Sequence, residues 1–325
     1  MSMEASILEV KNLTVEFHLK RGVLKAVDSL CFDVRESETL GIVGETGCGK
    51  SATALSVLRL IPSPPGEIVA GEILFEGEDL LKKSEAEMRH IRGRKISMVF
   101  QEPMTSLNPA MTIGEQIGEP YRIHLGHSRK AARDWTEHVL RLVQLPSPKT
   151  LLDRYPHQLS GGMRQRVMIA MALACQPKLV IADEPTTALD VTIQAQILDL
   201  LQELREQLKM ALIFISHNLG VVARLCDRIG VMYAGSLVEF ADKKTLFTKP
   251  LHPYTIGLLQ ALPRPESRHE PLKTIAGTVC DLLHPPSGCK FHPRCFKARE
   301  MCKQEPPKLE KHLGENLAAC YFPGV

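Results

Sequence analysis

The sequence predicts an α/β fold with a mainly parallel sheet, a helical subdomain and a small cysteine-containing extension at the C-terminal end. Short β-type runs alternate with helical segments, and a glycine-rich loop stands between a strand and a helix. Composition then shifts near residue 250: half of the 22 prolines fall between Pro250 and Pro323, and five of the nine cysteines follow residue 279. With 44% hydrophobic and 24% charged residues, the chain can bury a sizeable core, which excludes intrinsic disorder, a collagen-like repeat and a small disulfide scaffold.

Short apolar runs bounded by turn residues predict the strands. These runs are residues 7–17, 30–34, 39–44, 95–100, 178–182 and 211–216. A helix is predicted at 51–61, and residues 103–175 are predicted to be mostly helical, with a loop around 145–162. A further amphipathic helix presents one apolar face, formed by Ile193, Ile197, Leu200, Leu201 and Leu204. We therefore predict a first domain over residues 1–250, with a helical subdomain at about 103–175, and an extension over 251–325.

Charge and hydropathy exclude two other classes of protein. The net charge is +3 with both signs interspersed, and aromatic residues make up 5%, which argues against nucleic-acid binding. The longest apolar run, residues 167–175, is much shorter than the roughly 20 residues that a spanning helix needs. The first residues lack the basic start and apolar stretch of a secretory signal. We expect the chain not to cross a membrane and to stay in the cytosol.

The glycine-rich loop GETGCGKS matches the phosphate-binding pattern GxxxxGK[ST] between a strand and a helix. Its glycines let backbone N–H groups face phosphate oxygens, and the helix N-terminus adds positive potential. We expect Lys50 to reach the β- and γ-phosphates and Ser51 to ligate Mg²⁺. The alternative is a glycine-rich turn that carries a Lys-Ser pair by accident. The predicted nucleotide-binding residues of the loop are Gly44, Glu45, Thr46, Gly47, Cys48, Gly49, Lys50 and Ser51.

An acidic pair ends the apolar run LVIADE at residues 179–184. A buried strand would bring Asp183 to the water shell of a metal ion, and Glu184 would then polarise an attacking water. Taken alone, the Asp-Glu pair could also be the ordinary end of a strand with no catalytic role. Its significance rises because Lys50 lies upstream and His217 downstream.

The segment LSGGMRQ, residues 159–165, predicts a second anion-binding helix N-terminus at Ser160, Gly161 and Gly162. One nucleotide does not need two such sites in one chain. A head-to-tail dimer does, with each subunit's segment capping the γ-phosphate that the other subunit holds. The alternative is a serine N-cap followed by flexible glycines.

All these segments occur in one order, together with Gln101, the loop 187–190 and His217. Over about residues 7–250 the sequence therefore resembles ABC transporter ATPases. The resemblance implies that ATP is the nucleotide, and that the chain forms dimers across which two ATP molecules bind. No motif position is degenerate, so we expect an active ATPase.

The same resemblance implies roles for four further residues. Gln101 senses Mg²⁺ and the attacking water, and couples to the membrane subunit. His217 contacts the γ-phosphate, and Asp190 helps to organise the dimer seam. Phe17 would stack on adenine, although a core phenylalanine on an N-terminal strand explains this residue equally well.

The C-terminal segments HPYTIGLLQALP (252–263) and GCKFHPRCFKAREMC (288–302) resemble the extension of oligopeptide/dipeptide importer ATPases, a branch that includes nickel importers. QEPMTSLNP (101–109) and YPHQLSGGM (155–163) resemble the same branch. One departure is Cys280, where this branch usually has a proline. The resemblance implies partners: two integral-membrane permease subunits, a second ABC ATPase subunit and a solute-binding protein, with this chain peripheral at the cytoplasmic face of the plasma membrane.

Four cysteines of the extension form a candidate metal site: Cys289, Cys295, Cys302 and Cys320. On a proline-rich segment with little apolar periodicity, a metal–thiolate centre would replace a large core. Zinc sites usually carry CxxC pairs, which are absent here, and four cysteines can equally hold an iron–sulfur cluster. The resemblance implies a [4Fe–4S] cluster, with zinc and then unligated buried thiols as alternatives. Because the nucleotide motifs end by His217, we expect this centre to be structural and separate from phosphoryl chemistry.

The predicted function is the ATP-hydrolysing subunit of an importer for dipeptides or oligopeptides. Three alternatives remain at this point: the same role for nickel or another chelated metal, a non-transport ABC ATPase, and a non-catalytic regulatory subunit. The second alternative usually has a long coiled-coil insertion or two nucleotide domains, which this sequence lacks. The third conflicts with the presence of both Glu184 and His217.

Overall fold

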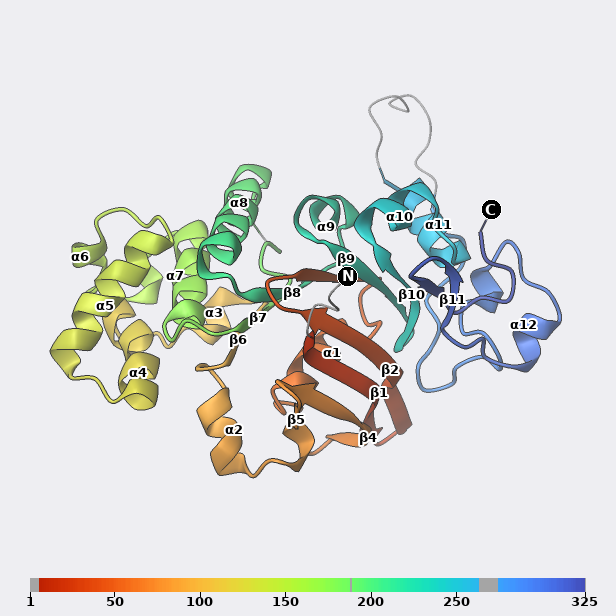
Figure 1. Cartoon of the computed structure of the whole chain (residues 1–325), viewed down its shortest axis with the longest axis horizontal. Helices are drawn as coiled ribbons and strands as arrows, with labels where there is room; N and C mark the ends of the chain where they lie inside the picture. The colour runs from red at the N-terminus through yellow and green to blue at the C-terminus, as the bar shows by residue number, and fades with distance from the viewer. Residues whose placement is uncertain (1–5, 188, 263–273, 325) are drawn as a thin grey trace. The chain divides into compact units, whose positions relative to one another are not determined.

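The computed structural model of the chain describes residues 6–187, 189–262 and 274–324. Parts of three sequence features lie outside the described residues: the start of the chain, position 188 of the loop 187–190, and the end of the segment 252–263 with the proline-rich stretch that follows it. The chain divides into two compact units (Figure 1). The first unit consists mainly of Lys82–Ile215, and the second of Leu8–Val34, Thr39–Leu81 and Ser216–Val325.

The first unit contains a parallel sheet with strand order β6-β7-β8. The strands are β6 (Ile96–Val99), β7 (Leu179–Asp183) and β8 (Ala211–Ser216). Every residue of these strands is buried. Their continuous apolar runs are the pattern expected of parallel strands that are covered on both faces.

Helices make up most of the rest of the first unit, and α4, α5 and α7 pack on one another at the left of Figure 1. The helical elements are α2 (Glu85–Ile91), α3 (Pro103–Ser106), α4 (Ile113–Leu125), α5 (Arg129–Leu142), α6 (Pro148–Leu151), η2 (Pro156–Gln158), α7 (Gly161–Leu173) and α8 (Val191–Leu208). Side-chain hydrogen bonds cap the N-termini of several of these helices. In α4, for example, the Thr112 hydroxyl accepts the Glu115 N–H while the Glu115 carboxylate accepts the Thr112 N–H.

The second unit contains an antiparallel sheet with strand order β2-β1-β4-β5 and a set of strands that pair as β3-β9-β10-β12-β11. The strands are β1 (Ser6–Leu19), β2 (Gly22–Arg35), β3 (Thr39–Val43), β4 (Gly66–Phe75), β5 (Glu78–Asp79), β9 (Arg228–Tyr233), β10 (Ser236–Asp242), β11 (Glu310–Leu313) and β12 (Asn316–Ala318). Strand β3 pairs with β9 in parallel, whereas β10 pairs with both β9 and β12 in antiparallel fashion. The end of the extension therefore joins the same sheet as the strand that precedes the phosphate loop.

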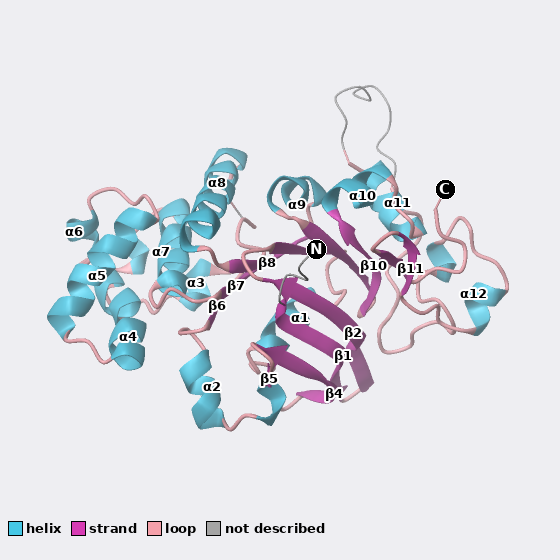
Figure 2. Ribbon diagram, viewed as in Figure 1, coloured by secondary structure: helices cyan, strands magenta, loops and turns pink. Residues whose placement is uncertain are grey.

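Helices of the second unit are shorter. They are α1 (Lys50–Val57), η1 (Leu80–Lys82), α9 (Leu219–Leu225), α10 (Lys243–Thr248), α11 (Pro253–Gln260), η4 (His292–Arg294) and α12 (Met301–Gln304). After α11 the described part of the extension is mostly loop, as the pink trace in Figure 2 shows. This segment must therefore be ordered by side-chain contacts more than by helices or strands.

The predicted strands at 95–100, 178–182 and 211–216 are confirmed, and so is the helical region at 103–175, whose predicted loop contains α6 and η2. Two predictions were wrong in part. The predicted parallel pairing is present, between β3 and β9 and between β7 and both β6 and β8, but the antiparallel strands were not predicted: β10–β12 pair in antiparallel fashion, and β1, β2 and β4 belong to a separate antiparallel sheet. The helix predicted at 51–61 ends at Val57. The Leu60 N–H donates to the Leu55 carbonyl and Arg59 adopts φ 51°, so that the chain turns out of the helix without the usual glycine.

Candidate functional site

The phosphate loop begins where the fully buried strand β3 ends. Gly44, Gly47 and Gly49 have φ values of 156°, 82° and 102°, in the left-handed region that favours glycine. A Cβ on Gly44 would lie 2.2 Å from the Met232 carbonyl oxygen, and one on Gly49 would lie 2.3 Å from the Ala26 carbonyl oxygen. The loop therefore runs against neighbouring backbone so closely that no side chain fits at these two positions.

Lys50, the first residue of α1, lies over this loop with only 5% of its surface exposed. Its Nζ donates hydrogen bonds to the carbonyl oxygens of Gly44 (2.8 Å) and Glu45 (3.1 Å). Thr46, Gly47 and Ser51 are exposed. The arrangement combines a helix N-terminus, a buried ammonium group and accessible loop atoms, which is what the predicted anion-binding site requires.

Cys48 is also buried, and burial raises the pKa of its thiol. Its carbonyl oxygen accepts a hydrogen bond from the Gly235 N–H at 3.0 Å. The loop is thus attached to the turn between β9 and β10. This turn was not a predicted feature of the site.

The first unit brings together two predicted catalytic residues that are far apart in sequence. Glu184 follows β7 directly, and its Oε2 accepts hydrogen bonds from Gln101 Nε2 (3.3 Å) and Thr187 Oγ1 (2.9 Å). Asp183, the last residue of β7, is 5% exposed. Glu184 adopts φ 45°, and its N–H donates to the Ile215 carbonyl at 3.0 Å. A non-glycine residue in the left-handed region is uncommon, and such residues cluster at functional sites.

The predicted second anion site stands at the start of α7. Ser160 is the exposed N-cap, and its Oγ accepts the Met163 N–H at 3.4 Å. Gly161 is also exposed, whereas a Cβ on Gly162 would lie 2.8 Å from Ile193 Cγ2 at the start of α8. The two helices therefore approach each other closely at this glycine.

Asp190 caps α8, where its Oδ1 accepts the Ile193 N–H at 2.9 Å. In the second unit, His217 is exposed between β8 and α9. Phe17 lies on β1 opposite Gly66 of β4, and is half-buried. A Cβ on Gly66 would lie 2.9 Å from its ring, so the ring covers that glycine. The roles of these three residues toward ATP stay predictions.

Two residues that the sequence did not single out contact the phosphate loop from the C-terminal part of the chain. Arg294 forms two hydrogen bonds with the Glu45 carboxylate, of 2.7 and 3.0 Å, and the Tyr254 hydroxyl accepts the Glu45 N–H at 2.9 Å. Both lie in the segments that resemble importer ATPases, but no spacing in the sequence indicates that their partner is Glu45. The extension therefore contacts the phosphate loop directly, while the expectation that the cysteine centre is not needed for phosphoryl chemistry stays a prediction.

The four predicted metal-site cysteines line one cavity of about 20 Å³. Burial raises the pKa of Cys289 to about 11, and it also raises the pKa of Cys295 and Cys320. All four are free thiols. Within the described ranges, however, no group of three or more His, Cys, Asp or Glu side chains is arranged to hold a metal ion, so these positions do not support the iron–sulfur expectation.

No helix among the described residues is long and apolar enough to span a membrane.

Comparison with known proteins identifies two family regions. Residues 27–187 match the family model described as ABC transporter, and residues 238–302 match the model described as oligopeptide/dipeptide transporter, C-terminal region. The second region covers Tyr254 and Arg294, which contact the phosphate loop, and three of the four cysteines of the cavity.

Curated relatives match over nearly the whole chain. The oligopeptide transport ATP-binding protein OppD of Haemophilus influenzae is 50% identical over 97% of this chain and 97% of its own length. The dipeptide transport ATP-binding protein DppD of Bacillus subtilis is 49% identical over 97% of this chain and 94% of its own length.

Solved structures share the fold. A dimeric bacterial ABC transporter cassette is 28% identical, with a TM-score of 0.65, over 73% of this chain and 98% of that one. A cassette in a post-hydrolysis state with bound ADP and phosphate is 27% identical, also with a TM-score of 0.65 and the same coverage. These matches and the geometry of the phosphate loop agree: the chain belongs to the ATP-binding proteins of ABC transporters, in the branch that carries the oligopeptide/dipeptide transporter C-terminal region.

Proposed function

We propose that this chain is the ATP-hydrolysing subunit of an importer for dipeptides or oligopeptides. The contact of Glu184 with Gln101 at the end of buried strand β7 supports ATP hydrolysis and not nucleotide binding alone. The peptide cargo is supported by the curated relatives, which are named for oligopeptide and dipeptide transport.

ATP binding would use the phosphate loop. Its backbone N–H groups and the ammonium of Lys50 would neutralise the phosphates, with Lys50 already positioned by the carbonyls of Gly44 and Glu45. Phe17 would supply an aromatic face for adenine. Ser51, Gln101 and Asp183 offer the oxygen ligands that Mg²⁺ prefers, and bound Mg²⁺ would neutralise charge on the phosphates.

Hydrolysis would use the Glu184 carboxylate as the proton acceptor for an attacking water. Gln101 and Thr187 both donate to its Oε2, which fixes the rotamer of the carboxylate. His217 would contact the γ-phosphate from the end of β8. The left-handed backbone of Glu184 directly after strand β7 is of the uncommon kind that clusters at functional sites.

We propose further that the chain works as a head-to-tail dimer, with a second copy or a related ATPase. Ser160, Gly161 and Gly162 would cap the γ-phosphate held by the other subunit, and Asp190 would order the seam. Exposure of Ser160 and Gly161 at the start of α7 is consistent with such a contact. Two permease subunits would anchor the dimer at the cytoplasmic face of the membrane, and a solute-binding protein would deliver the cargo.

For the four cysteines we propose a [4Fe–4S] cluster, with zinc as the alternative. Four cysteine thiolates are the usual ligands of such a cluster, and all four thiols line one cavity, but they would have to move closer together because they are not arranged to hold a metal ion in the described structure. The bound cluster would supply structural cross-links. Anaerobically purified protein should then contain about four irons and four sulfides per chain. One zinc per chain and no iron would establish the alternative, and protein without either metal would overturn both.

The ATPase proposal is tested by Glu184→Gln in the purified full chain. The amide cannot accept a proton, so turnover should fall by at least about a hundredfold while ATP still binds. Glu206→Gln is the matched control, because Glu206 is an exposed carboxylate on α8 whose described hydrogen bond is to Gln202. Turnover of Glu184→Gln at the wild-type rate would show that another group accepts the proton.

A further inference from the structure

An ion pair joins the C-terminal extension to the phosphate loop. Arg294 Nη1 and Nη2 donate to the two oxygens of Glu45 at 2.7 and 3.0 Å, and the Arg294 side chain is only 5% exposed. These hydrogen bonds to Glu45 raise the pKa of Arg294 above its usual range. Bidentate, partly buried pairs of this kind fix a carboxylate in one direction.

Glu45 is the second residue of the phosphate loop, so its carboxylate is a negative charge within an anion-binding site. Left unpaired, it would repel the phosphates of a bound nucleotide. The Arg294 guanidinium compensates this charge and draws the carboxylate toward the extension. Backbone carbonyls of the extension hold Arg294 in turn, since its Nε donates to Ala276 O at 3.1 Å.

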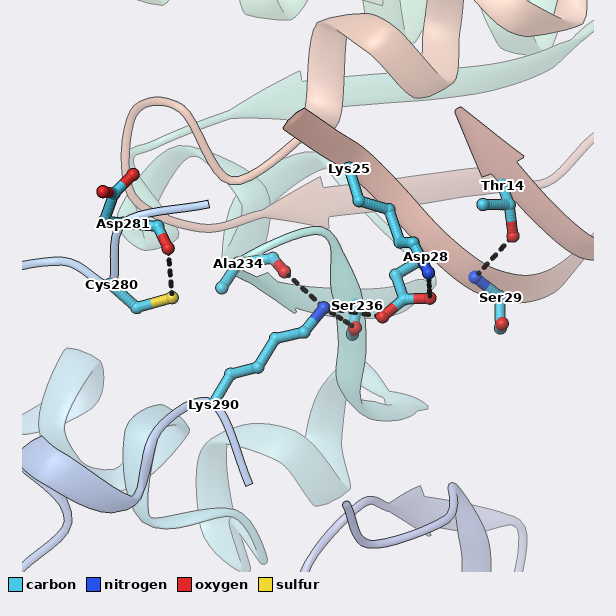
Figure 3. A network of polar contacts seen from close by, with 9 residues as sticks. All are labelled: Thr14, Lys25, Asp28, Ser29, Ala234, Ser236, Cys280, Asp281 and Lys290. Atoms are coloured by element: carbon cyan, nitrogen blue, oxygen red, sulfur yellow. Dashed lines mark hydrogen bonds and ion pairs between the residues drawn. The ribbon is translucent and has the colours of Figure 1, made fainter. Parts of the chain in front are cut away.

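Other residues of the same short segment fasten it beside the loop. Lys290 Nζ donates to Asp28 Oδ2 (2.8 Å), Ala234 O (2.9 Å) and Ser236 Oγ (3.0 Å), as Figure 3 shows. Burial alone would raise the pKa of Asp28, but the hydrogen bond and charge of Lys290 hold it below its usual value.

Ala234 and Gly235 form the turn between β9 and β10, and the Gly235 N–H donates to Cys48 O of the phosphate loop. Lys290 therefore reaches the loop through this turn. These hydrogen bonds form a second connection between the extension and the loop, in addition to the ion pair of Arg294.

Aromatic packing completes the attachment. Phe291 is 2% exposed, and its ring lies 5.1 Å from that of Tyr233 and 5.3 Å from that of Tyr254. Tyr254 is the residue whose hydroxyl accepts the Glu45 N–H. Lys290, Phe291 and Arg294 all lie between Cys289 and Cys295, two of the cysteines on the thiol cavity.

We propose that residues 290–294 act as a clamp on the phosphate loop, in which Arg294 is a positioning residue that neutralises Glu45 and holds its carboxylate away from the nucleotide. The clamp makes nucleotide affinity depend on the extension. This inference rests on the proposed binding of ATP at the loop.

The test measures binding of Mg²⁺ with the non-hydrolysable analogue AMP-PNP to the purified full chain. Arg294→Met exposes the loop to an uncompensated carboxylate, so the dissociation constant should rise about tenfold. Glu45→Gln should bind as tightly as wild type or more tightly. The double variant Arg294→Met/Glu45→Gln should regain the affinity of Glu45→Gln, because no carboxylate remains to be neutralised.

Arg299→Met is the matched control: this arginine of the extension lies over the Phe322 ring at 4.2 Å, and its loss should leave affinity unchanged. Wild-type affinity in Arg294→Met, or failure of Glu45→Gln to restore it, would overturn the clamp. If Arg294→Met does not fold, Arg294→Lys replaces it, with a smaller loss that Glu45→Gln must again reverse. Absence of AMP-PNP binding to the wild-type chain would instead overturn the proposed function.

Discussion

The phosphate loop is ordered by local backbone geometry, whereas the clamp segment 290–294 is ordered by side-chain contacts with distant parts of the sequence. The loop follows a fully buried strand and takes its shape from glycines at positive φ, all within eight residues. The clamp segment contains only the short helix η4. Its side chains bind residues that are distant in the sequence: 249 positions separate Arg294 from Glu45, and 262 separate Lys290 from Asp28. Local backbone geometry leaves a motif in the sequence, whereas long-range side-chain pairing does not.

The largest effect is expected from disturbing the local geometry. A methyl group in Gly49→Ala would meet the Ala26 carbonyl oxygen at 2.3 Å at φ 102°, so the loop must move. We expect nucleotide affinity to fall at least about a hundredfold and the protein to lose roughly 2–4 kcal/mol of stability. Titration with Mg²⁺ and AMP-PNP, together with denaturant unfolding, measures both.

Gly77→Ala is the control for this variant. Gly77 also has a positive φ, of 80°, but no atom lies within 4 Å of the added methyl group. The Gly77→Ala variant should lose only about 1 kcal/mol of folding stability and should bind nucleotide with wild-type affinity. Equal losses of affinity in both variants would mean that close backbone approach does not shape the loop.

This contrast explains which parts of the protein could be predicted. The loop, the strand before Glu184 and the apolar face of α8 follow local patterns, and of the five residues predicted for that face Ile197, Leu200, Leu201 and Leu204 are buried. The end of α1 was missed because Arg59, not glycine, takes the left-handed position. The contact of Gln101 with Glu184 was not predicted, because the two residues are 83 positions apart and family resemblance indicated only that both belong to the nucleotide site.

A smaller effect is expected from loosening the clamp at its end. Cys295 adjoins Arg294 and lines the thiol cavity, so Cys295→Ser should loosen the extension and weaken AMP-PNP binding about threefold. Limited proteolysis should become faster in the extension. Cys280→Ser is the control, because Cys280 is not among the residues that line this cavity. Faster proteolysis with unchanged affinity would separate the cysteines from the clamp.

A separate effect is expected in the pH dependence of stability. His252 caps α11 with Nδ1 accepting the Tyr254 N–H at 3.1 Å, and burial lowers the pKa of His252 to about 3. Because the unfolded chain binds this proton near pH 6.5 and the folded chain does not, stability should fall by about 1.4 kcal/mol per pH unit as pH drops below roughly 6.5.

An asparagine at position 252 can still cap α11. The free energy of unfolding of His252→Asn should therefore depend less on pH between about pH 6 and 4 than that of wild type. His90→Gln, at an exposed histidine, should leave the dependence unchanged. Identical pH profiles for His252→Asn and wild type would show that the buried histidine does not control stability in this range.

The most direct test of the proposed function is uptake of a labelled tripeptide by cells that carry the permease subunits but lack their own copy of this chain. Wild-type chain should restore uptake, Glu206→Gln should do the same, and Glu184→Gln should abolish uptake while the protein accumulates normally. Peptide uptake that persists with Glu184→Gln, or restored uptake of nickel but not of peptide, would contradict a peptide importer driven by ATP hydrolysis at Glu184.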